Sequence, residues 1–502
     1  MASTAEPDTS RDKPLSPLLP SLLLLPPPPR PAARDALSAA YRPPLEAALS
    51  KLRTEGREDG AVLIVAVAAP FLGPHPQQPH KRTLSWPSAQ TLVAGLYGLI
   101  SVICARLGVP TELHGGPGSV DARVALVDHE PSRRYTGDAD GALAFTTKPA
   151  IETNNTVLVD LASFAAAYHP WHRIYHANTE EGNALLTTYL RLLERRVLQP
   201  MPRPLRQDQL VMVPGGLAMT VATRAGPGPA AAQEDPATEL RRTVCVGGTF
   251  DHLHPGHKLL LHAAVLLLDV PDPALASPAG TAGRTTTGPC RLIVGITGDE
   301  LLRRKKYAEL VQPWDLRAEY VIEFLSAVLS LSKRGWGSPL QQQQGRGEAA
   351  DGASGGATGE GGTTTASAKR GVDFLDTRVV TRTADELVVR FRGGAVEVQC
   401  VVIHDMYGPT ATREDVDALV VSGETRAGGK AVNEKRAELG WHALEIFEVD
   451  VLDAEETAGD GSTADGGGGS APTKTEDFAS KISSTAIRKQ KAEAAAASGS
   501  RV

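Results

Sequence analysis

Blocks of apolar residues separated by polar turns run along most of the chain, and their lengths predict strands alternating with helices. In the first half, buried-strand patterns lie at 61–67, 123–127 and 156–160, and helical patterns lie at 88–107 and 182–198. In the second half, a β-branched run with Val244 and Val246 ends in two glycines and precedes a helix that starts near Gly256. Further strands are predicted at 291–297, 396–403, 418–422 and 444–451, with helices at 316–332 and 431–439. This alternation predicts an α/β fold with a doubly wound parallel, Rossmann-like sheet, in which ligands bind at the carboxyl ends of the strands.

Low-complexity segments divide the chain into regions. The Pro/Leu-rich stretch 1–43 is predicted to be a disordered tail, because repeated prolines forbid a continuous helix. Residues 44–222 form a separate α/β region of unknown role, 223–238 are a linker by composition, and 239–490 form the second domain. Three polar segments of that domain are predicted as disordered insertions at low entropic cost, and a disordered tail ends the chain: 271–289, 338–369, 454–475 and 491–502.

Composition narrows the class of protein. With 502 residues, of which 41% are hydrophobic, the chain can bury a large core, and its net charge of −6 gives no general attraction to nucleic acid or to anionic membranes. The four cysteines are far apart and without metal-ligand spacing, which fits buried thiols in a reducing, cytoplasmic compartment. No apolar run is expected to reach the length of a membrane span.

The turn after the strand that contains Val244 has the chemistry of an anion site. Gly247 and Gly248 let the backbone approach a ligand, and the free N–H groups of the following helix face the same space. His254 and His257, three residues apart, can both point at one phosphate chain, and Thr249 adds a hydroxyl. This donor cluster lacks a covalent nucleophile, which favours direct displacement at phosphorus.

Three blocks carry a family resemblance. The string GGTFDHLHPGH at 247–257 is similar to the GTFDxxHxGH signature of the nucleotidyltransferase superfamily. VVSGETRAGGKAVNEKRAELGW at 420–441 and KISSTAIRKQ at 481–490 resemble the corresponding blocks of phosphopantetheine adenylyltransferase, in its eukaryotic and archaeal form. The resemblance covers roughly 241–490, interrupted by the insertions, and identifies 239–490 as a nucleotidyltransferase domain.

The resemblance implies roles for individual residues. The catalytic group would be Thr249, His254, His257 and one lysine of Lys305 and Lys306, with Thr249 orienting the attacking phosphate and the histidines stabilising the α-phosphate. ATP would contact Gly247, Gly248, Thr249, Phe250, His257, Ser422, Glu424, Thr425, Ser483, Ser484, Thr485 and Arg488. The acceptor would contact Asp405, Tyr407, Asn433 and Arg436. Mg²⁺ would arrive with the nucleotide, because no carboxylate cluster suggests a metal site made by the protein.

The implied reaction is transfer of AMP from ATP to 4′-phosphopantetheine, giving dephospho-coenzyme A and pyrophosphate. The alternatives are another adenylyl- or cytidylyltransferase, such as nicotinamide mononucleotide adenylyltransferase, or a scaffold that only binds nucleotide. No GxxxxGK[ST] string occurs, so a separate dephospho-coenzyme A kinase is expected downstream. Association with other enzymes of coenzyme A synthesis is a further expectation, and neither nucleic acid nor a membrane is expected as a partner.

Overall fold

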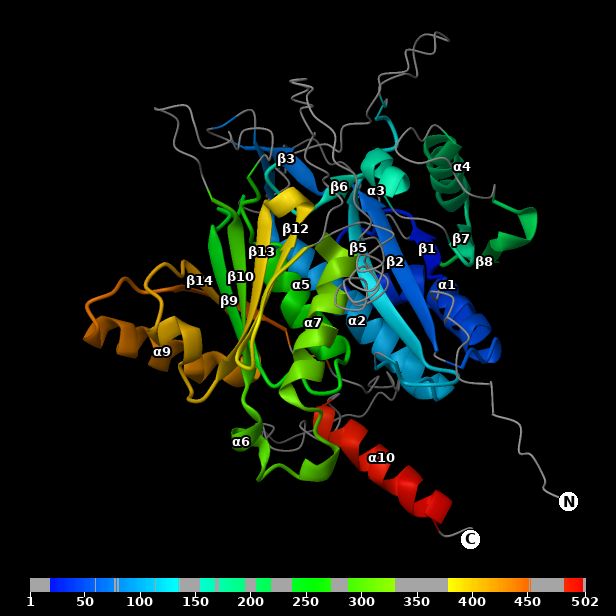
Figure 1. Ribbon diagram of the computed structural model, residues 1–502. Helices are drawn as coiled ribbons and strands as arrows, with labels where there is room; N and C mark the ends of the chain where they lie inside the picture. Colours follow the sequence, from blue (N-terminus) through cyan, green and yellow to red (C-terminus); the bar gives the residue numbers. More distant parts are fainter. Residues whose placement is uncertain are drawn as a thin grey trace, which may run out of the picture.

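Two parallel-stranded sheets form the frame of the protein in the computed structural model (Figure 1). The structure describes residues 19–58, 60–75, 78, 81–112, 114–133, 135, 154–167, 171–194, 205–217, 237–271, 288–329, 378–450, 452 and 483–499. Nearly all of the predicted linker and of the three predicted insertions lie outside these residues, as do residues 1–18 and 500–502.

The first sheet has six strands, all parallel, in the order β6-β5-β2-β1-β7-β8. Its strands are β1 (Ser21–Leu25), β2 (Ala61–Ala69), β5 (Val120–Asp128), β6 (Val159–Asp160), β7 (Ile174–Asn178) and β8 (Leu210–Pro214). A small antiparallel pair, β3 (Leu72–Pro74) and β4 (Arg82–Leu84), lies beside it. The fully apolar pattern of β1 and β2 is that of strands covered on both faces.

The second sheet has seven strands in the order β11-β12-β13-β10-β9-β14-β15. These are β9 (Thr243–Gly248), β10 (Cys290–Thr297), β11 (Arg378–Arg382), β12 (Glu386–Phe391), β13 (Val396–Ile403), β14 (Ala418–Ser422) and β15 (Glu445–Val449). The five strands from β13 to β15 are parallel, and the unpredicted hairpin β11–β12 adds an antiparallel edge. The strand order reverses between β9 and β14, which is the arrangement of a doubly wound sheet, so the predicted fold class is confirmed.

Helices fill three layers around these sheets (Figure 1). Helices α1 (Arg34–Thr54), α2 (Trp86–Leu107), α5 (Pro255–Val265) and α7 (Trp314–Leu329) share the middle layer and one continuous apolar core. Helices α3 (Leu161–Ala167) and α4 (Glu180–Glu194) cover the outer face of the first sheet, and α9 (Arg426–Glu438) covers that of the second. The short α6 (Asp299–Leu302) follows β10, and α10 (Ser484–Gly499) ends the described chain.

Helix α2 is the apolar centre of the middle layer. Ser85 caps its first turn and Gly108, at φ 64°, ends it in the left-handed conformation that glycine adopts without strain. Its 22 residues are long and apolar enough to span a membrane, so the expectation that no apolar run reaches that length is wrong. The helix is mostly buried between the sheets, and its Trp86 Nε1 donates to the Ala263 carbonyl of α5 at 2.9 Å.

Two predicted tails are ordered secondary structure. The prediction of a disordered tail at 1–43 is wrong from residue 19 onward, because Leu22–Leu25 are completely buried in β1, at the centre of the first sheet. The prolines that suggested disorder lie before and after the strand, outside its ladder of hydrogen bonds. The prediction of a tail at 491–502 is wrong through Gly499, because the alanine-rich sequence continues α10, and alanine is the strongest helix former.

Buried charges join the two halves of the molecule. On β5, Asp121 lies within ion-pair distance of Arg123 and of Lys258 from α5, and Arg123 also reaches Glu323 on α7 at 3.1 Å. All four side chains are buried. A second link is Arg392, whose Nη1 donates to the Thr156 carbonyl at 3.1 Å. The region 44–222 therefore has its own sheet but shares its core and its buried charges with the second domain.

Candidate active site

The predicted nucleotide segments meet where the strand order of the second sheet reverses. Strand β9 ends in Gly247 and Gly248, and the neighbouring β14 ends at Ser422. A side chain at Gly247 would meet only open space, so the backbone there is accessible. Because ligands of doubly wound sheets bind at this switch point, both segments lie where the fold favours a nucleotide.

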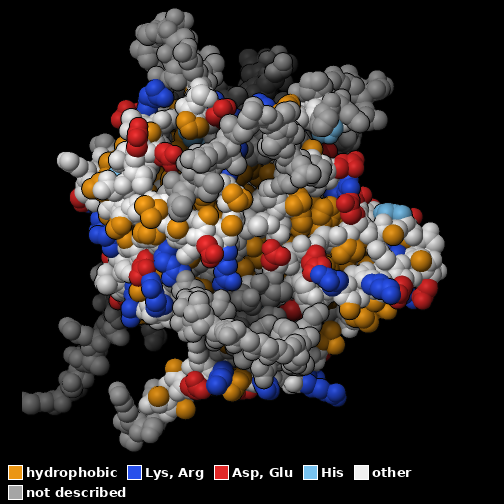
Figure 2. Space-filling model, turned by 180° about the vertical axis from the view of Figure 1, so that it is seen from behind, with side chains coloured by type: hydrophobic (Ala, Val, Ile, Leu, Met, Phe, Trp, Pro, Cys, Tyr) orange, Lys and Arg blue, Asp and Glu red, His pale blue; other side chains and the backbone are white. Residues whose placement is uncertain are grey.

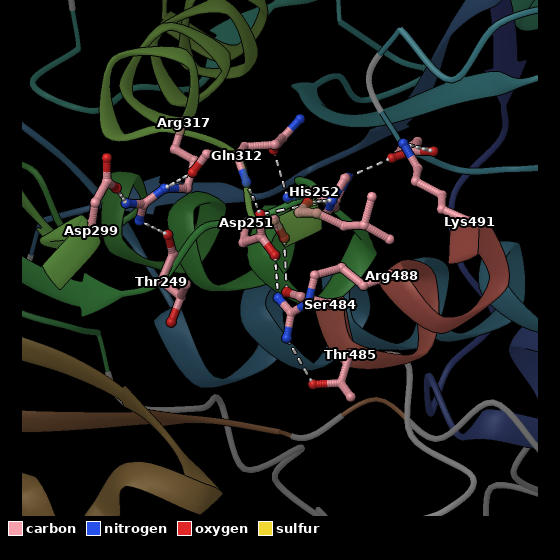
Figure 3. Close-up of polar contacts among 12 residues, drawn as sticks. Thr249, Asp251, His252, Asp299, Gln312, Arg317, Ser484, Thr485, Arg488 and Lys491 are labelled. Carbon is pink, nitrogen blue, oxygen red and sulfur yellow. Dashed lines mark hydrogen bonds and ion pairs between the residues drawn. The ribbon is translucent and has the colours of Figure 1, made fainter. Parts of the chain in front are cut away.

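The loop after β9 is held in a strained conformation by contacts from α7. Phe250 and His252 have φ values of 51° and 47°, a region in which non-glycine residues are uncommon. The completely buried guanidinium of Arg317 fixes the loop by donating to the carbonyls of Thr249 (2.7 Å), Thr297 (2.8 Å) and Gln312 (2.9 Å). In Figure 3 the Thr249 side chain points away from Arg317, so its hydroxyl is directed away from the supporting contacts.

Asp251 fastens the last helix to this loop (Figure 3). Its completely buried carboxylate accepts from the Gln312 N–H at 2.9 Å and forms an ion pair with Arg488. Its carbonyl accepts the Ser484 hydroxyl at 2.8 Å. The two motifs from opposite ends of the second domain therefore form one structural unit.

The two motif histidines form a stacked pair at the start of α5. The rings of His254 and His257 lie 3.9 Å apart at 25°, and Phe250 packs on His257 at 5.3 Å. The Nδ1 atom of each histidine is buried with no hydrogen-bond partner. Burial, and then the electrostatic effect of the neighbouring His252 and Arg317, lowers the pKa of His257 to about 3. Burial also holds the pKa of His254 well below its usual value, so both imidazoles are neutral near pH 7.

His252 lies beside the pair and contacts both halves of the molecule. Its Nδ1 lies 3.0 Å from Glu112 Oε2 and its Nε2 lies 2.9 Å from the Leu310 carbonyl. Its backbone N–H donates to Gln312 Oε1 at 2.7 Å. Glu112 belongs to the first half of the chain, which thus contributes directly to the surroundings of the motif loop.

The predicted phosphate-binding groups at 483–488 and 305–306 lie next to this loop. Ser483 caps α10 by accepting from the Ala486 N–H at 3.3 Å. Arg488 is buried, and besides Asp251 it donates to the Lys306 carbonyl (3.1 Å) and to Thr485 Oγ1 (3.1 Å). Its guanidinium therefore supports the loop in this structure, while the side chains of Lys305 and Lys306 are exposed.

The residues predicted at 422–425 form the turn between β14 and α9. The Ser422 N–H donates to Thr425 Oγ1 at 3.0 Å, and the two hydroxyls lie 3.2 Å apart. Glu424 is exposed in the same turn. These groups lie at the carboxyl end of β14, next to the switch point, and the hydroxyls of Ser422 and Thr425 contact each other.

The four predicted acceptor contacts lie in the turn after β13 and on α9. Asp405 closes its own turn by accepting from the N–H groups of Tyr407 (2.8 Å) and Gly408 (2.7 Å). The Asn433 side chain both donates to and accepts from the Leu444 backbone, which ties α9 to the strand that follows. Arg436 is completely buried and donates only to four carbonyls: those of Thr410, Arg413, Glu414 and His442. Both side chains hold α9 against the segments around it, and their contact with an acceptor stays a prediction.

Four residues of the site were missed by the sequence analysis. Asp251 and His252 lie inside the motif GGTFDHLHPGH, but the motif does not indicate that they hold the loop in place. Arg317 had a weaker signal, as a lone arginine on the apolar face of a helix that also carries Trp314 and Val321. Glu112 had none, because its partner is 140 residues away in the sequence.

The electrostatics of the site are local. Figure 2 shows the molecule from behind, and on that face acidic and basic side chains are interspersed with no large area of one sign. Among the described residues, no group of three or more His, Cys, Asp or Glu side chains is arranged to hold a metal ion. Attraction of an anion therefore has to come from the loop, its histidines and the nearby cations.

Known proteins resemble parts of the chain. A family model described as "Domain of unknown function (DUF8446)" matches residues 6–219, less than half of the chain. A protein of Saccharomyces cerevisiae named phosphopantetheine adenylyltransferase is 26% identical over 216 residues, which are 43% of this chain and 43% of the yeast protein. Proteins of the same name from Pyrococcus horikoshii and Thermococcus gammatolerans are 24% identical over 211 residues and 39% identical over 83 residues. These matches cover 42% of this chain and 79% of the Pyrococcus protein, and 16% of this chain and 39% of the Thermococcus protein.

The structural comparison adds little. A crystal structure of a protein with unknown function from Archaeoglobus fulgidus is 22% identical, covering 41% of this chain and 97% of that one, with a TM-score of 0.21. The matched segment spans less than half of the yeast relative. Over part of its length, the chain is therefore similar to proteins whose name denotes a nucleotidyltransferase-type enzyme.

Proposed function

We propose that this chain transfers AMP from ATP to 4′-phosphopantetheine, giving dephospho-coenzyme A and pyrophosphate. The observation that carries the proposal is the stacked pair of neutral histidines at the switch point of the second sheet, beside an accessible glycine backbone. The names of the partly matching relatives support the choice of acceptor.

In the proposed reaction, an oxygen of the acceptor phosphate attacks the α-phosphorus of ATP. The bond from that phosphorus to the oxygen that bridges to the β-phosphorus breaks, and the electron pair leaves with pyrophosphate. Because Nδ1 of His254 and of His257 is buried without a partner, Nε2 is the ring atom of each that would donate to the α-phosphate. A donor already in place when charge develops stabilises the transition state without reorganisation.

The remaining groups would bind the two substrates. The Thr249 hydroxyl would orient the attacking phosphate, and the turn at Ser422–Thr425 would contact the adenosine. Ser483 and Thr485 at the start of α10, with an exposed lysine at 305 or 306, would hold the pyrophosphate. Mg²⁺ bound to the nucleotide would supply further charge neutralisation.

A panel of acceptors tests the proposal. Purified protein is incubated with ATP or CTP and, separately, with 4′-phosphopantetheine, nicotinamide mononucleotide or no acceptor, and pyrophosphate release is measured. We expect release only with ATP and 4′-phosphopantetheine. Release only with nicotinamide mononucleotide would show that the protein is the alternative adenylyltransferase. Binding of ATP without pyrophosphate release in any mixture would show that it is a scaffold that only binds nucleotide.

We propose further that the reaction stops at dephospho-coenzyme A. A kinase for the ribose hydroxyl normally needs a GxxxxGK[ST] loop to cradle the donor phosphates. The nearest string, Gly423 to Lys430, has its first glycine one residue too far from the Gly-Lys pair and is followed by Ala431. Coenzyme A formed by a preparation free of host kinase would contradict this proposal.

A further inference from the structure

Glu112 is a point where three distant segments of the chain meet. It lies in the loop between α2 and β5, in the part of the chain matched by the domain of unknown function, and only 9% of its surface is exposed. One carboxylate oxygen, Oε2, contacts His252 Nδ1 at 3.0 Å, and the other, Oε1, contacts Lys491 Nζ on α10 at 3.0 Å. Figure 3 shows His252 and Lys491 on either side of this contact point.

The contacts of His252 define how it is held. A carbonyl oxygen can only accept a hydrogen bond, so Nε2 donates to Leu310. The other ring nitrogen, Nδ1, faces the Glu112 carboxylate, so both polar atoms of the ring are engaged. Glu112 is ionised near neutral pH: burial opposes the charge, but hydrogen bonds from His252 and Lys491 lower its pKa overall.

The same segment of the first half also holds the other side of the motif. The Thr111 carbonyl, next to Glu112, lies 3.3 Å from Lys258 Nζ, and Lys258 pairs with the buried Asp121. His252 and Lys258 flank the stacked histidines in the sequence. The loop, whose φ values at Phe250 and His252 are unfavourable, is thus fixed on both sides by residues of the first half.

We infer that Glu112 is a positioning residue of the nucleotide site, through which the first half of the chain aligns the motif loop by way of His252 and α10 by way of Lys491. This inference rests on the proposed adenylyl transfer and deepens it, because it gives the region 44–222 a role in the reaction. Glu112 itself touches neither substrate. Its effect is to keep the motif loop and α10, which would both contact the phosphates, at a fixed separation.

The test compares Glu112→Ala and Glu112→Gln with the matched variant Glu55→Ala. Glu55 likewise binds a histidine, His172 at 2.9 Å, and an arginine, Arg173 at 2.8 Å, but both partners lie in the first half. We expect Glu112→Ala to lower kcat about 10- to 100-fold, in line with the effect of a misplacement of about 1 Å in a reacting group. The KM for 4′-phosphopantetheine should change less than kcat, Glu112→Gln should recover part of the loss, and Glu55→Ala should leave kcat at the wild-type value.

A second measurement does not depend on turnover. Hydrogen exchange of the ligand-free full chain should show faster exchange at 249–257 and in α10 in Glu112→Ala, with the wild-type rates kept in Glu55→Ala. If Glu112→Ala does not fold, Lys491→Ala replaces it, because Lys491 is exposed and its loss should loosen α10 alone. Wild-type kcat together with unchanged exchange in the folded variant would overturn the inference.

The two proposals fail separately. If the wild-type protein does not transfer AMP to any acceptor, the proposed function fails, and hydrogen exchange still tests whether Glu112 fixes the loop and α10. If transfer occurs and Glu112→Ala retains both its kcat and its protection, only the positioning role is lost.

Discussion

At the scale of single residues, the site depends on imidazoles kept neutral by burial. His254 at the N-cap of α5, and His257 and His262 within that helix, have buried Nδ1 atoms without partners. Burial is the first cause of the lowered pKa of each. A neutral imidazole donates one hydrogen bond without a permanent charge that would bind substrate and transition state equally. Such groups favour the charge that develops during transfer.

The first prediction concerns His257. Replacing His257 with alanine removes a donor to the α-phosphate, so we expect kcat to fall about 10²- to 10³-fold, with a much smaller change in ATP affinity. Steady-state kinetics combined with ATP binding by calorimetry measure the two effects. An unchanged kcat would remove His257 from the catalytic group.

The second prediction concerns the acid side of the stability curve. Burial lowers the pKa of His262 from 6.5 to about 4, so between these values the unfolded chain binds a proton that the folded chain does not. The free energy of unfolding therefore falls as the pH falls from 6.5 toward 4, and is unaffected by this group above 6.5. For one such histidine the loss between pH 6.5 and pH 5 is about 2 kcal/mol.

His262→Leu should remove that contribution. Urea unfolding at pH 7 and pH 5 should show a smaller acid loss in the variant than in the wild type, by the amount assigned to one histidine. Equal losses in the two proteins would mean that His262 takes up its proton in the folded state at an ordinary pH.

At the scale of elements, the strands with long β-branched runs could be predicted from the sequence. Val396–Ile403 and Ala418–Ser422 have the predicted bounds, because valine-rich segments favour strands. β1 was missed because its residues are leucines beside prolines, a composition typical of disordered segments. The hairpin β11–β12 was missed because Arg378–Arg382 is a short, largely polar edge strand.

The site was predictable to the extent that it lies in contiguous motifs. The two glycines end the strand that precedes the motif histidines, and the start of α10 contacts the same loop through Asp251. The supporting contacts could not be predicted. Arg317 and Arg436 bind carbonyl oxygens, which every residue has, so no residue type in the sequence marks their partners.

The third prediction concerns the buried charges between β5 and α5. Asp121→Ala leaves Lys258 buried without its carboxylate, so we expect a destabilisation of about 3–5 kcal/mol. The matched control is Asp208→Ala, which breaks an exposed pair with Arg206 and should cost less than about 1 kcal/mol. Denaturant unfolding measures both, and similar costs would show that the buried network contributes no more than a surface pair.

At the scale of the whole molecule, two sheets share one apolar core. Val124 of the first sheet and Val246 of the second belong to the same cluster, with α2 and α5 between them. Neither half can therefore be removed without exposing a large apolar face. This sharing explains how a region without a nucleotide motif can be needed for a site in the other half.

The fourth prediction concerns residues 345–366, which lie outside the described residues. Their sequence is too polar and glycine-rich to bury a core, so deleting Gly345 to Ala366 should leave the melting temperature and kcat unchanged. Thermal unfolding and the pyrophosphate assay test this on the same preparation. A large drop in melting temperature would show that the segment is packed against the folded domain.

The shared core also affects how the protein is made on the ribosome. Helix α2 ends at Leu107, but two residues that contact its Trp86 are added to the chain much later. These are Ala263, whose carbonyl accepts from the indole, and Phe447 of β15, whose ring centroid lies 5.1 Å from that of Trp86. Until then the face of α2 that packs on α5 and β15 stays uncovered in the nascent chain. Exposed apolar surface of this kind promotes aggregation during folding, so we expect truncated forms that end before α5 to require a chaperone to stay in solution.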